Sequence, residues 1–386
     1  MRIAVNTRFL QPGNLEGVGY YTREICRRLP DLLPQAEFLF CFDRPFSPEY
    51  VAHPRVHGVQ IFPPARDPVL WRYWFDFCLP RRVRRWRADV LLHFDGFCSL
   101  NTRVPQVVVT HDIAHYHYPE AVPGRVQRYY EKYVPQFLDK AKKNITVSEF
   151  VREDIGRVYG LDPQAIGLAG NGVRDTFHPV AAERRESIRN TYTGGRPYFF
   201  YLGAVHPRKN IVRLIEAYDR YRTNTADGIP LLLGGRLAWQ LEEVRAAHRR
   251  SAFQHDILFL GYVAEAEIND LLGSAVALVY PSLSEGFGVP LLEAMHAEVP
   301  ILTSNRTSLP EVAADAALYI DPEDVASIAD GLSTIAGDAV LRERLVAAGR
   351  QRREHYNWDA AAETVASALR DVYQSEAINS RPPNNL

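Results

Sequence analysis

Residues 277–295 have the sequence ALVYPSLSEGFGVPLLEAM, which predicts a buried strand, a glycine-containing loop and the start of a helix. The apolar run 277–280 is typical of a strand covered on both faces, and Pro290 suits the first turn of the helix that follows. Gly286 and Gly288 let the backbone pass close to a ligand and present N–H groups at the start of a helix, where anions are stabilised. This unit is the building block of a parallel α/β sheet.

The same alternation of strand-like and helix-like segments extends over the whole chain. The sequence predicts strands at 2–9, 38–43, 89–94, 106–112, 144–149, 197–205, 229–236, 257–263, 277–283, 299–304 and 317–322. It predicts helices at 19–30, 126–141, 148–159, 210–221, 266–275, 290–297, 325–337 and 358–373. We therefore expect an α/β protein with two doubly wound domains, in which ligands bind beyond the carboxyl ends of the strands.

Length and composition restrict the class of protein. The 386 residues exceed what one hydrophobic core usually serves, which favours two domains. The chain is 46% hydrophobic and 24% charged with a net charge of −1, which excludes a disordered chain and argues against a dedicated nucleic-acid binder. No apolar run approaches the roughly 20 residues of a membrane-spanning helix, and no signal-peptide pattern follows Met1. Four cysteines are too few for a disulfide framework, so we expect a cytoplasmic protein with reduced thiols.

The near-zero net charge is the sum of two halves of opposite sign. Residues 1–178 contain 24 basic and 19 acidic side chains, a net charge of +5. Residues 179–386 contain 21 and 27, a net charge of −6. Such an asymmetry can steer an anionic ligand to one side of a cleft, although scatter together with one basic surface helix explains it equally well.

The basic excess is concentrated in segment 66–87. Six of its seven arginines lie close to Trp71, Trp74 and Trp86 in the sequence: Arg72, Arg81, Arg82, Arg84, Arg85 and Arg87. Arginine and tryptophan together suit a membrane interface, so one interpretation is peripheral contact with the inner face of the cell membrane. The other is an amphipathic helix whose aromatic side chains pack in the core while the arginines face water. The two interpretations are compatible, because one helix can pack its aromatic side chains in the core and contact a membrane with its exposed face.

Two carboxylates lie eight positions apart in the opening segment, and we expect Glu285 in the loop and Glu293 in the first turn of the helix. A carboxylate can accept two O–H donors, which suits the hydroxyl pairs of a sugar or a ribose. Taken singly, Glu293 could complement the helix dipole and Glu285 could be a solvated loop residue. Their joint occurrence with Phe287, Gly288 and Val289 favours a ligand-binding site.

A second loop, between a strand that ends at Leu202 and a helix that begins after Asn210, carries Arg208 and Lys209. Two cations beside a helix N-terminus suit a diphosphate, whose charge must be neutralised when it departs as a leaving group. The chain has 40 arginines and 5 lysines, and Lys209 is the only lysine after residue 143. A compact ammonium at this point indicates a role that a planar guanidinium fills poorly, whereas the alternative is two solvated loop cations.

Together these segments resemble the retaining GT-B glycosyltransferases of family 4. The resemblance rests on the Glu-x7-Glu pattern of Glu285 and Glu293 and on the PRKN loop 207–210, and it spans nearly the whole chain. Residues 171–179 look like the family's interdomain junction, and Trp358 with the final helix looks like its crossover to the N-terminal domain. The stretches VNTRFL, GVGYYTREI and VVVTHDIAHYHYPE are most similar to mannosyltransferases of bacterial O-antigen and exopolysaccharide assembly.

The resemblance implies a GT-B fold, in which two Rossmann-like domains face a central cleft. On this basis residues 1–178 are the acceptor-side domain and 179–355 the nucleotide-sugar donor domain. Residues 356–375 are the helix that crosses back to the N-terminal domain, and 376–386 are a flexible tail.

The resemblance also assigns roles on the donor side. Glu293 binds the ribose hydroxyls, and Lys209 with Arg208 neutralises the diphosphate. Glu285 binds hydroxyls of the donor sugar, assisted by the backbone N–H groups of Phe287, Gly288 and Val289, and the backbone around Tyr262 holds the base. Many relatives have an arginine directly after the strand-ending glycine, where this chain has Ala204, and Arg208 is the candidate to supply that charge.

On the acceptor side, Gly17 and Gly19 precede a helical pattern, so their N–H groups could meet a phosphate, although a plain turn has the same pattern. His111 and Asp112 end a strand where the family has a histidine near the transferred sugar, so His111 would contact that sugar and Asp112 the acceptor or His111. The alternative is a polar pair that caps the loop. His115 and His117 lack carboxylate or thiolate company, so we expect no metal.

The predicted activity is retaining transfer of a hexose, favoured as mannose from GDP-mannose, to a hydroxyl of a glycan or lipid-linked glycan in polysaccharide biosynthesis. No protein nucleophile stands in the motifs, which favours same-face attack with the diphosphate as proton acceptor and no metal or other cofactor. The expected partners are the sugar-nucleotide donor and the glycan acceptor, and no nucleic acid. Two alternatives stay open: a sugar-nucleotide epimerase or phosphorylase of the same fold, and a catalytically idle partner in a polysaccharide-assembly complex.

Overall fold

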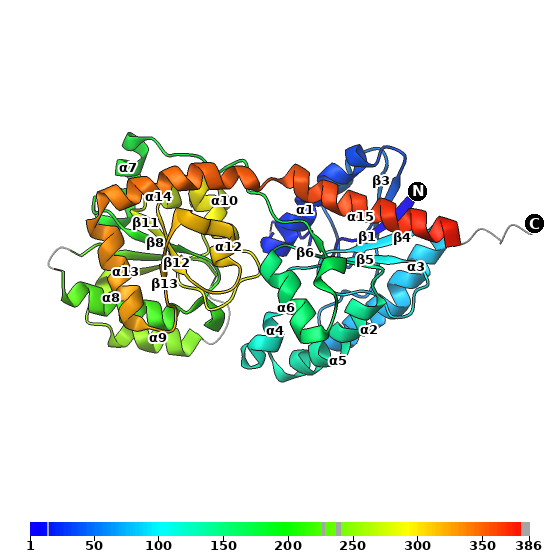
Figure 1. Ribbon diagram of the computed structural model, residues 1–386, viewed down its shortest axis with the longest axis horizontal. Helices are drawn as coiled ribbons and strands as arrows, with labels where there is room; N and C mark the ends of the chain where they lie inside the picture. The colour runs from blue at the N-terminus through cyan, green and yellow to red at the C-terminus, as the bar shows by residue number, and fades with distance from the viewer. Residues whose placement is uncertain (14, 226–227, 237–240, 380–386) are drawn as a thin grey trace, which may run out of the picture. The chain divides into compact units, whose positions relative to one another are not determined.

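The computed structural model describes residues 1–379 apart from 14, 226–227 and 237–240. Its contacts divide the chain into two compact units (Figure 1). Unit 1 contains Met1–Asn171 and the C-terminal segment from Asn357, and unit 2 contains Gly172–Tyr356. The first division therefore falls seven residues before the boundary expected at 178/179.

Unit 1 is built on a parallel seven-stranded sheet with the order β3-β2-β1-β4-β5-β6-β7. The strands are β1 (Arg2–Asn6), β2 (Glu37–Phe42), β3 (Val56–Gln60), β4 (Val90–His93), β5 (Gln106–Thr110), β6 (Lys143–Thr146) and β7 (Gly167–Leu168). The helices are α1 (Gly17–Leu32), α2 (Pro68–Tyr73), α3 (Leu79–Trp86), α4 (Ala114–His117), α5 (Gly124–Lys140), α6 (Glu149–Tyr159) and α15 (Trp358–Asn379). The central strands are fully buried, as a sheet with helices on both faces requires.

Unit 2 repeats this architecture with a parallel six-stranded sheet of order β10-β9-β8-β11-β12-β13. Its strands are β8 (Phe199–Leu202), β9 (Leu231–Gly234), β10 (Ile257–Gly261), β11 (Ala277–Tyr280), β12 (Ile301–Ser304) and β13 (Ala317–Ile320). Its helices are α7 (Ala182–Thr193), α8 (Ile211–Thr223), α9 (Leu241–Arg250), α10 (Glu265–Gly273), α11 (Val289–His296), α12 (Leu309–Ala313), α13 (Val325–Gly337) and α14 (Ala339–Arg352). The two doubly wound α/β units agree with the predicted fold class.

The strand order of each sheet places a switch point next to the predicted site segments. In unit 2 the order reverses between β8 and β11, and in unit 1 between β1 and β4. Ligands of doubly wound sheets bind at the carboxyl ends of the strands that flank such a point. The loops after β8 and β11 are the two segments that carry Lys209 and Glu285.

The C-terminal helix α15 packs against α1 within unit 1, and Figure 1 shows it in orange to red. It begins at Trp358 and continues to Asn379, so residues 376–379 are helical and their assignment to a flexible tail was wrong. The sequence 374–379 contains no glycine or proline to end the helix, and Glu376 forms an ion pair with Lys142 at 3.2 Å. Residues 380–386 lie outside the described part of the chain.

Segment 66–87 forms α2, a π-helical turn (Trp74–Cys78) and α3 without a break. Trp74 is fully buried and donates from Nε1 to the carbonyl of Ile61 at 3.0 Å, while Trp71 and Trp86 pack partly buried against the same core. Five of the six arginines close to the tryptophans in the sequence are exposed, but Arg72 is paired with the buried carboxylate of Asp76. The tryptophans therefore pack in the core, as the amphipathic-helix interpretation expects.

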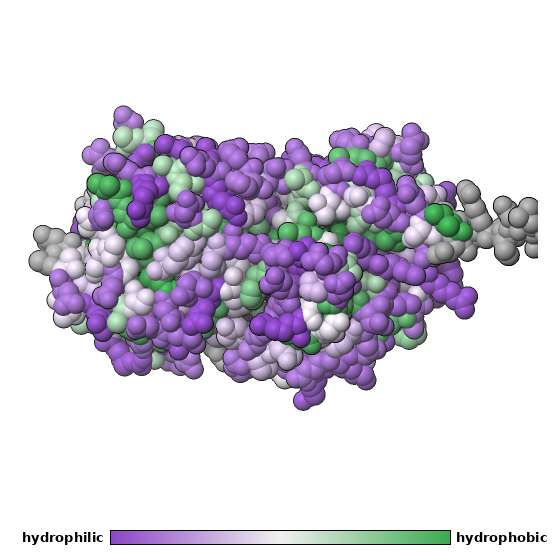
Figure 2. All heavy atoms as spheres, in the orientation of Figure 1, coloured by the Kyte–Doolittle hydropathy of each residue, from purple (hydrophilic) through white to green (hydrophobic). Residues whose placement is uncertain are grey.

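None of the described helices is long and apolar enough to cross a membrane. The face drawn in Figure 2 is largely hydrophilic, with small scattered apolar patches, as is usual for globular proteins.

Candidate functional site

A buried ion pair joins the two predicted donor loops at the carboxyl ends of β8 and β11. The Lys209 ammonium donates to Glu285 Oε1 at 2.5 Å and to the Tyr280 hydroxyl at 2.6 Å. Lys209 is 9% exposed and Glu285 is 6% exposed. Lys209 ends the short 3₁₀ turn Pro207–Lys209, and Tyr280 is the last residue of β11, so regular structure fixes both ends of the contact.

The cations beside Glu285 keep its carboxylate ionised. Burial alone would raise the pKa of Glu285, but the adjacent Lys209 and Arg208 cations overcome that effect and lower its pKa to about 2. The pKa of the Tyr280 hydroxyl is raised well above its ordinary value by burial and by the neighbouring carboxylate. Near neutral pH the Glu285 carboxylate is therefore ionised and the Tyr280 phenol is neutral.

Arg208 also lies in this site and contacts the other carboxylate oxygen of Glu285. Its Nη1 donates to Glu285 Oε2 at 3.2 Å and to the carbonyl of Ser284 at 3.0 Å. The backbone joins the same two loops, because Leu283 N donates to the carbonyl of Arg208 at 2.8 Å. Arg208 thus brings a guanidinium to the site although Ala204 follows the strand-ending glycine.

The turn that presents the two cations is held by Asn210, which starts α8. Asn210 has φ 64°, a left-handed conformation that asparagine tolerates better than most residues. Its Nδ2 donates to the carbonyls of Pro281 and Pro322 at 3.1 and 2.6 Å. This buried amide therefore ties the turn to the loop after β11.

The glycine-containing loop is anchored around Glu285. Glu285 N donates to Thr307 Oγ1 at 3.1 Å, and Ser308 Oγ donates to the Glu285 carbonyl at 2.9 Å. Gly288 caps α11 with φ 95°, and a Cβ there would lie 2.6 Å from Leu309 Cδ2. Only glycine fits this position without strain.

The other residues predicted to contact the nucleotide sugar differ in burial. The Phe287 ring is buried and meets the Tyr356 ring edge-on at 5.2 Å, whereas Val289 begins α11. The Tyr262 side chain follows β10 and is 71% exposed. The role of these residues at a nucleotide stays a prediction.

Glu293 lies on α11 in a separate ion pair that the sequence did not indicate. Its Oε1 accepts from Arg174 Nη2 at 2.7 Å. Burial raises the pKa of Glu293 above its ordinary value, and the Arg174 guanidinium partly offsets that increase. Arg174 lies in the junction segment 171–179. No short-range pattern links it to Glu293, which is 119 residues away.

In unit 1, β5 ends at Thr110, so His111 and Asp112 lie in the loop after the strand and not at its end, where the sequence placed them. The His111 ring meets Tyr21 edge-on at 4.8 Å, and burial lowers the pKa of the imidazole. Its Nε2 is buried and has no hydrogen-bond partner among the described residues. Asp112 Oδ1 accepts from Ala114 N at 3.0 Å and so caps the next turn. Asp112 therefore has the loop-capping contact, and a catalytic role for either residue stays a prediction.

Gly17 and Gly19 lie in the first turn of α1, which begins at Gly17. A Cβ on Gly19 would lie 2.8 Å from the carbonyl oxygen of Phe9, so close packing explains this glycine. Gly17 has open space around its Cα. Tyr21, one turn further along α1, contacts both His111 and Trp358. No sequence pattern indicated these contacts.

The two histidines of α4, His115 and His117, contact α6. His115 Nε2 lies 3.3 Å from the Tyr159 hydroxyl, and His117 Nε2 lies 2.7 Å from Asp154 Oδ2. Within the part of the chain that the structure describes, no group of three or more histidine, cysteine, aspartate or glutamate residues could hold a metal ion.

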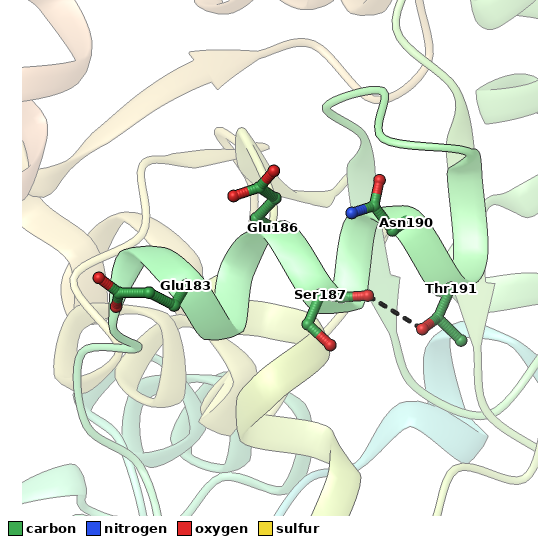
Figure 3. A pocket seen from close by; sticks show the side chains of 5 residues that line it. All are labelled: Glu183, Glu186, Ser187, Asn190 and Thr191. Carbon is green, nitrogen blue, oxygen red and sulfur yellow. Dashed lines mark hydrogen bonds between the residues drawn. The ribbon is translucent and has the colours of Figure 1, made fainter.

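A surface hollow is lined by none of the predicted site residues. Figure 3 shows that its lining comes from one helix, α7, with Glu183, Glu186, Ser187, Asn190 and Thr191. These side chains are exposed, and the drawn hydrogen bond is the ordinary one from Thr191 Oγ1 to the Ser187 carbonyl. An acidic, one-sided hollow repels a diphosphate and does not suit an anionic ligand.

Comparison with solved structures defines the class of protein. The chain matches sucrose-phosphate synthase from Thermosynechococcus elongatus with a TM-score of 0.76 and 18% identity, over 97% of this chain and 99% of the other. It matches HepE of Anabaena, solved with UDP and glucose, with a TM-score of 0.74 and 16% identity, over 96% and 100% of the two chains. These are GT-B glycosyltransferase structures, so the chain has the GT-B fold.

Sequence comparison then gives the family. Residues 15–177 match the model described as Glycosyltransferase Family 4, and residues 183–352 match Glycosyl transferases group 1. O-antigen chain mannosyltransferase B of Escherichia coli is 31% identical over 371 residues, which cover 92% of this chain and 96% of that protein. O-antigen chain mannosyltransferase RfbU of Salmonella typhimurium is 27% identical over 285 residues, covering 71% and 73%. The chain belongs to glycosyltransferase family 4.

The lowered pKa of Glu285 predicts how its ion pair contributes to stability. A carboxyl whose folded pKa is below its ordinary value of 4.5 stabilises the fold above that pH, and the contribution is lost as the pH falls towards about 2. The difference in free energy of unfolding between the native protein and Glu285→Gln should therefore shrink between pH 7 and pH 3, by on the order of 2 kcal/mol. Urea denaturation at a series of pH values measures it. Glu343→Gln, on the exposed face of α14, is the control, and a difference that stays constant with pH contradicts this electrostatic account.

Proposed function

We propose that this glycosyltransferase transfers a hexose from a sugar nucleotide to a hydroxyl of a glycan or lipid-linked glycan in polysaccharide biosynthesis, with retention at the anomeric carbon. The observation that carries the proposal is the buried Lys209–Glu285 pair, flanked by Arg208, at the switch point of unit 2. It combines two cations for a diphosphate with an ionised carboxylate for sugar hydroxyls.

The donor site is assigned from the charges of these groups. Lys209 and Arg208 would neutralise the diphosphate, which a half-chain with a net charge of −6 cannot attract by its total charge. Glu285 stays ionised near neutral pH because its pKa is about 2, so its oxygens can accept sugar hydroxyls. Glu293 would bind the ribose, and Phe287, Gly288, Val289 and Tyr262 would complete the contacts to sugar, phosphate and base.

In the proposed reaction the bond between the anomeric carbon and the diphosphate oxygen breaks, and its electron pair leaves with the diphosphate. The acceptor hydroxyl oxygen forms the new bond on the same face of the sugar, and its proton passes to a departing phosphate oxygen. Lys209 and Arg208 stabilise the negative charge that develops there, so the protein needs no metal ion for this step. For His111 we propose contact with the transferred sugar, and for Asp112 a role at the acceptor.

Mannose from GDP-mannose is the donor that we propose. The support is that curated relatives along most of this chain are named O-antigen mannosyltransferases. Contacts to the nucleotide base in this site would come chiefly from backbone near Tyr262. Assay of GDP-mannose beside UDP-glucose as donors tests the choice.

Substitution of Lys209 tests the proposed chemistry. Lys209→Ala should lower the rate of sugar transfer or of donor hydrolysis about 100-fold or more, because the leaving diphosphate loses its ammonium partner. Lys209→Arg retains the charge and checks for loss of folding, and Lys140→Ala, an exposed lysine of unit 1, is the control. The native rate should persist in EDTA. A near-native rate for Lys209→Ala places the diphosphate elsewhere, and complete inactivation by EDTA contradicts the metal-free step.

We further propose that segment 66–87 makes peripheral contact with an anionic membrane. Exposed side chains recur every four positions along α2, the π-helical turn and α3, at Val69, Tyr73, Phe77, Arg81 and Arg85. The stripe begins apolar, with Val69 63%, Tyr73 50% and Phe77 58% exposed, and ends basic. Phe62, which is 76% exposed, precedes it. Exposed aromatics beside arginines suit a bilayer surface with anionic head groups.

Vesicle sedimentation tests the membrane contact. The protein should bind vesicles that contain phosphatidylglycerol more strongly than phosphatidylcholine vesicles, and salt should weaken the binding. Arg81→Gln with Arg85→Gln should lower the partition coefficient about 10-fold or more, at about 1 kcal/mol per arginine. Tyr73→Ser with Phe77→Ser should lower it too, whereas Val340→Ser, a control residue 76% exposed in unit 2, should not. Equal binding by all variants contradicts the proposed surface.

A further inference from the structure

Glu293 forms an ion pair with Arg174, a residue outside the Glu-x7-Glu pattern. Glu293 lies in the middle of α11 and is 4% exposed. Arg174 reaches it from the segment that begins unit 2, which starts at Gly172. The Arg174 Nη2 to Glu293 Oε1 distance is 2.7 Å, within the range of a strong charge-assisted hydrogen bond.

Arg174 is itself held in place on two further sides. Its Nη1 lies 3.4 Å from Glu265 Oε1 at the start of α10, and its Cζ lies 4.8 Å from the centroid of the Phe177 ring. The side chain is 11% exposed. A planar guanidinium fixed in this way can set the orientation of the carboxylate that it binds.

A buried carboxylate needs such a partner to act as a hydroxyl acceptor. Without Arg174, burial would favour the neutral acid, because an unpaired buried charge is costly. A neutral acid has a proton on one oxygen and accepts fewer hydroxyls. With Arg174 on Oε1, the carboxylate is oriented and its other oxygen is not used by that contact.

We propose that Arg174 is a positioning residue for donor binding: its guanidinium orients the Glu293 carboxylate to accept the ribose hydroxyls of the sugar nucleotide. The inference rests on the proposed function of Glu293. Selection of a ribonucleotide would then depend also on Arg174, which lies outside the Glu-x7-Glu pattern in the segment that begins unit 2.

Calorimetric titration with GDP and UDP, and with the 2′-deoxy form of each, tests the inference. The native protein should bind one ribonucleotide at least about tenfold more tightly than its 2′-deoxy form. Both Glu293→Gln and Arg174→Gln should bind the ribonucleotide about tenfold more weakly or worse, and should lose most of the preference for it. The double variant should bind like the single variants, because the two residues act as one unit.

Matched variants separate this role from a loss of folding. Arg184→Gln removes another arginine ion pair, to Asp270 on α10 at 2.6 Å, and should retain native affinity and preference. Arg174→Lys retains a cation and should recover part of the preference. If Glu293→Gln loses the preference but Arg174→Gln retains it, the positioning role is wrong while the donor site stands. If the native protein binds neither nucleotide or does not prefer the ribose form, the proposed role of Glu293 fails as well.

Discussion

The candidate donor site depends on one constraint: a carboxylate buried at the carboxyl ends of the strands of a parallel sheet must remain charged. Glu285 meets it through contacts with Lys209 and Arg208, which come from the loop after the neighbouring strand β8. Because an unpaired buried charge is costly, the two loops must form together, and neither has its final electrostatics alone. The Asn210 amide and the Leu283–Arg208 backbone bond fix the same two loops to each other.

This arrangement would allow the acidic second half of the chain to bind an anionic ligand. The second half of the chain has a net charge of −6, so long-range attraction does not favour a diphosphate. Two cations at the carboxyl ends of β8 and β11 can attract an anion locally, because burial there reduces screening by solvent and salt. Since Glu285 neutralises part of their charge in the free protein, donor binding would exchange partners between groups that are already ordered. Such preorganisation lowers the cost of stabilising charge on the leaving group.

Much of the fold and of the donor site could be predicted from the sequence, because both depend on local patterns. The buried strands β8 and β11 appear as apolar runs, and Lys209 stands out because lysine is rare in this chain. Elements with weak patterns were missed. The edge strand β3 contains a glycine and alternates poorly, β7 has only two residues, and α7 is polar around most of its circumference. The contacts of Arg174 and Tyr21 join residues far apart in the sequence, so no local spacing could reveal them.

In the proposed donor site, Lys209 neutralises the diphosphate of the sugar nucleotide. Calorimetric titration of the native protein and of Lys209→Met with GMP and GDP tests this most directly, because the two ligands differ by one phosphate. We expect the native protein to prefer GDP to GMP by about tenfold or more, and Lys209→Met to lose this preference while its affinity for GMP changes little. A preference that survives unchanged in Lys209→Met would contradict this role of Lys209.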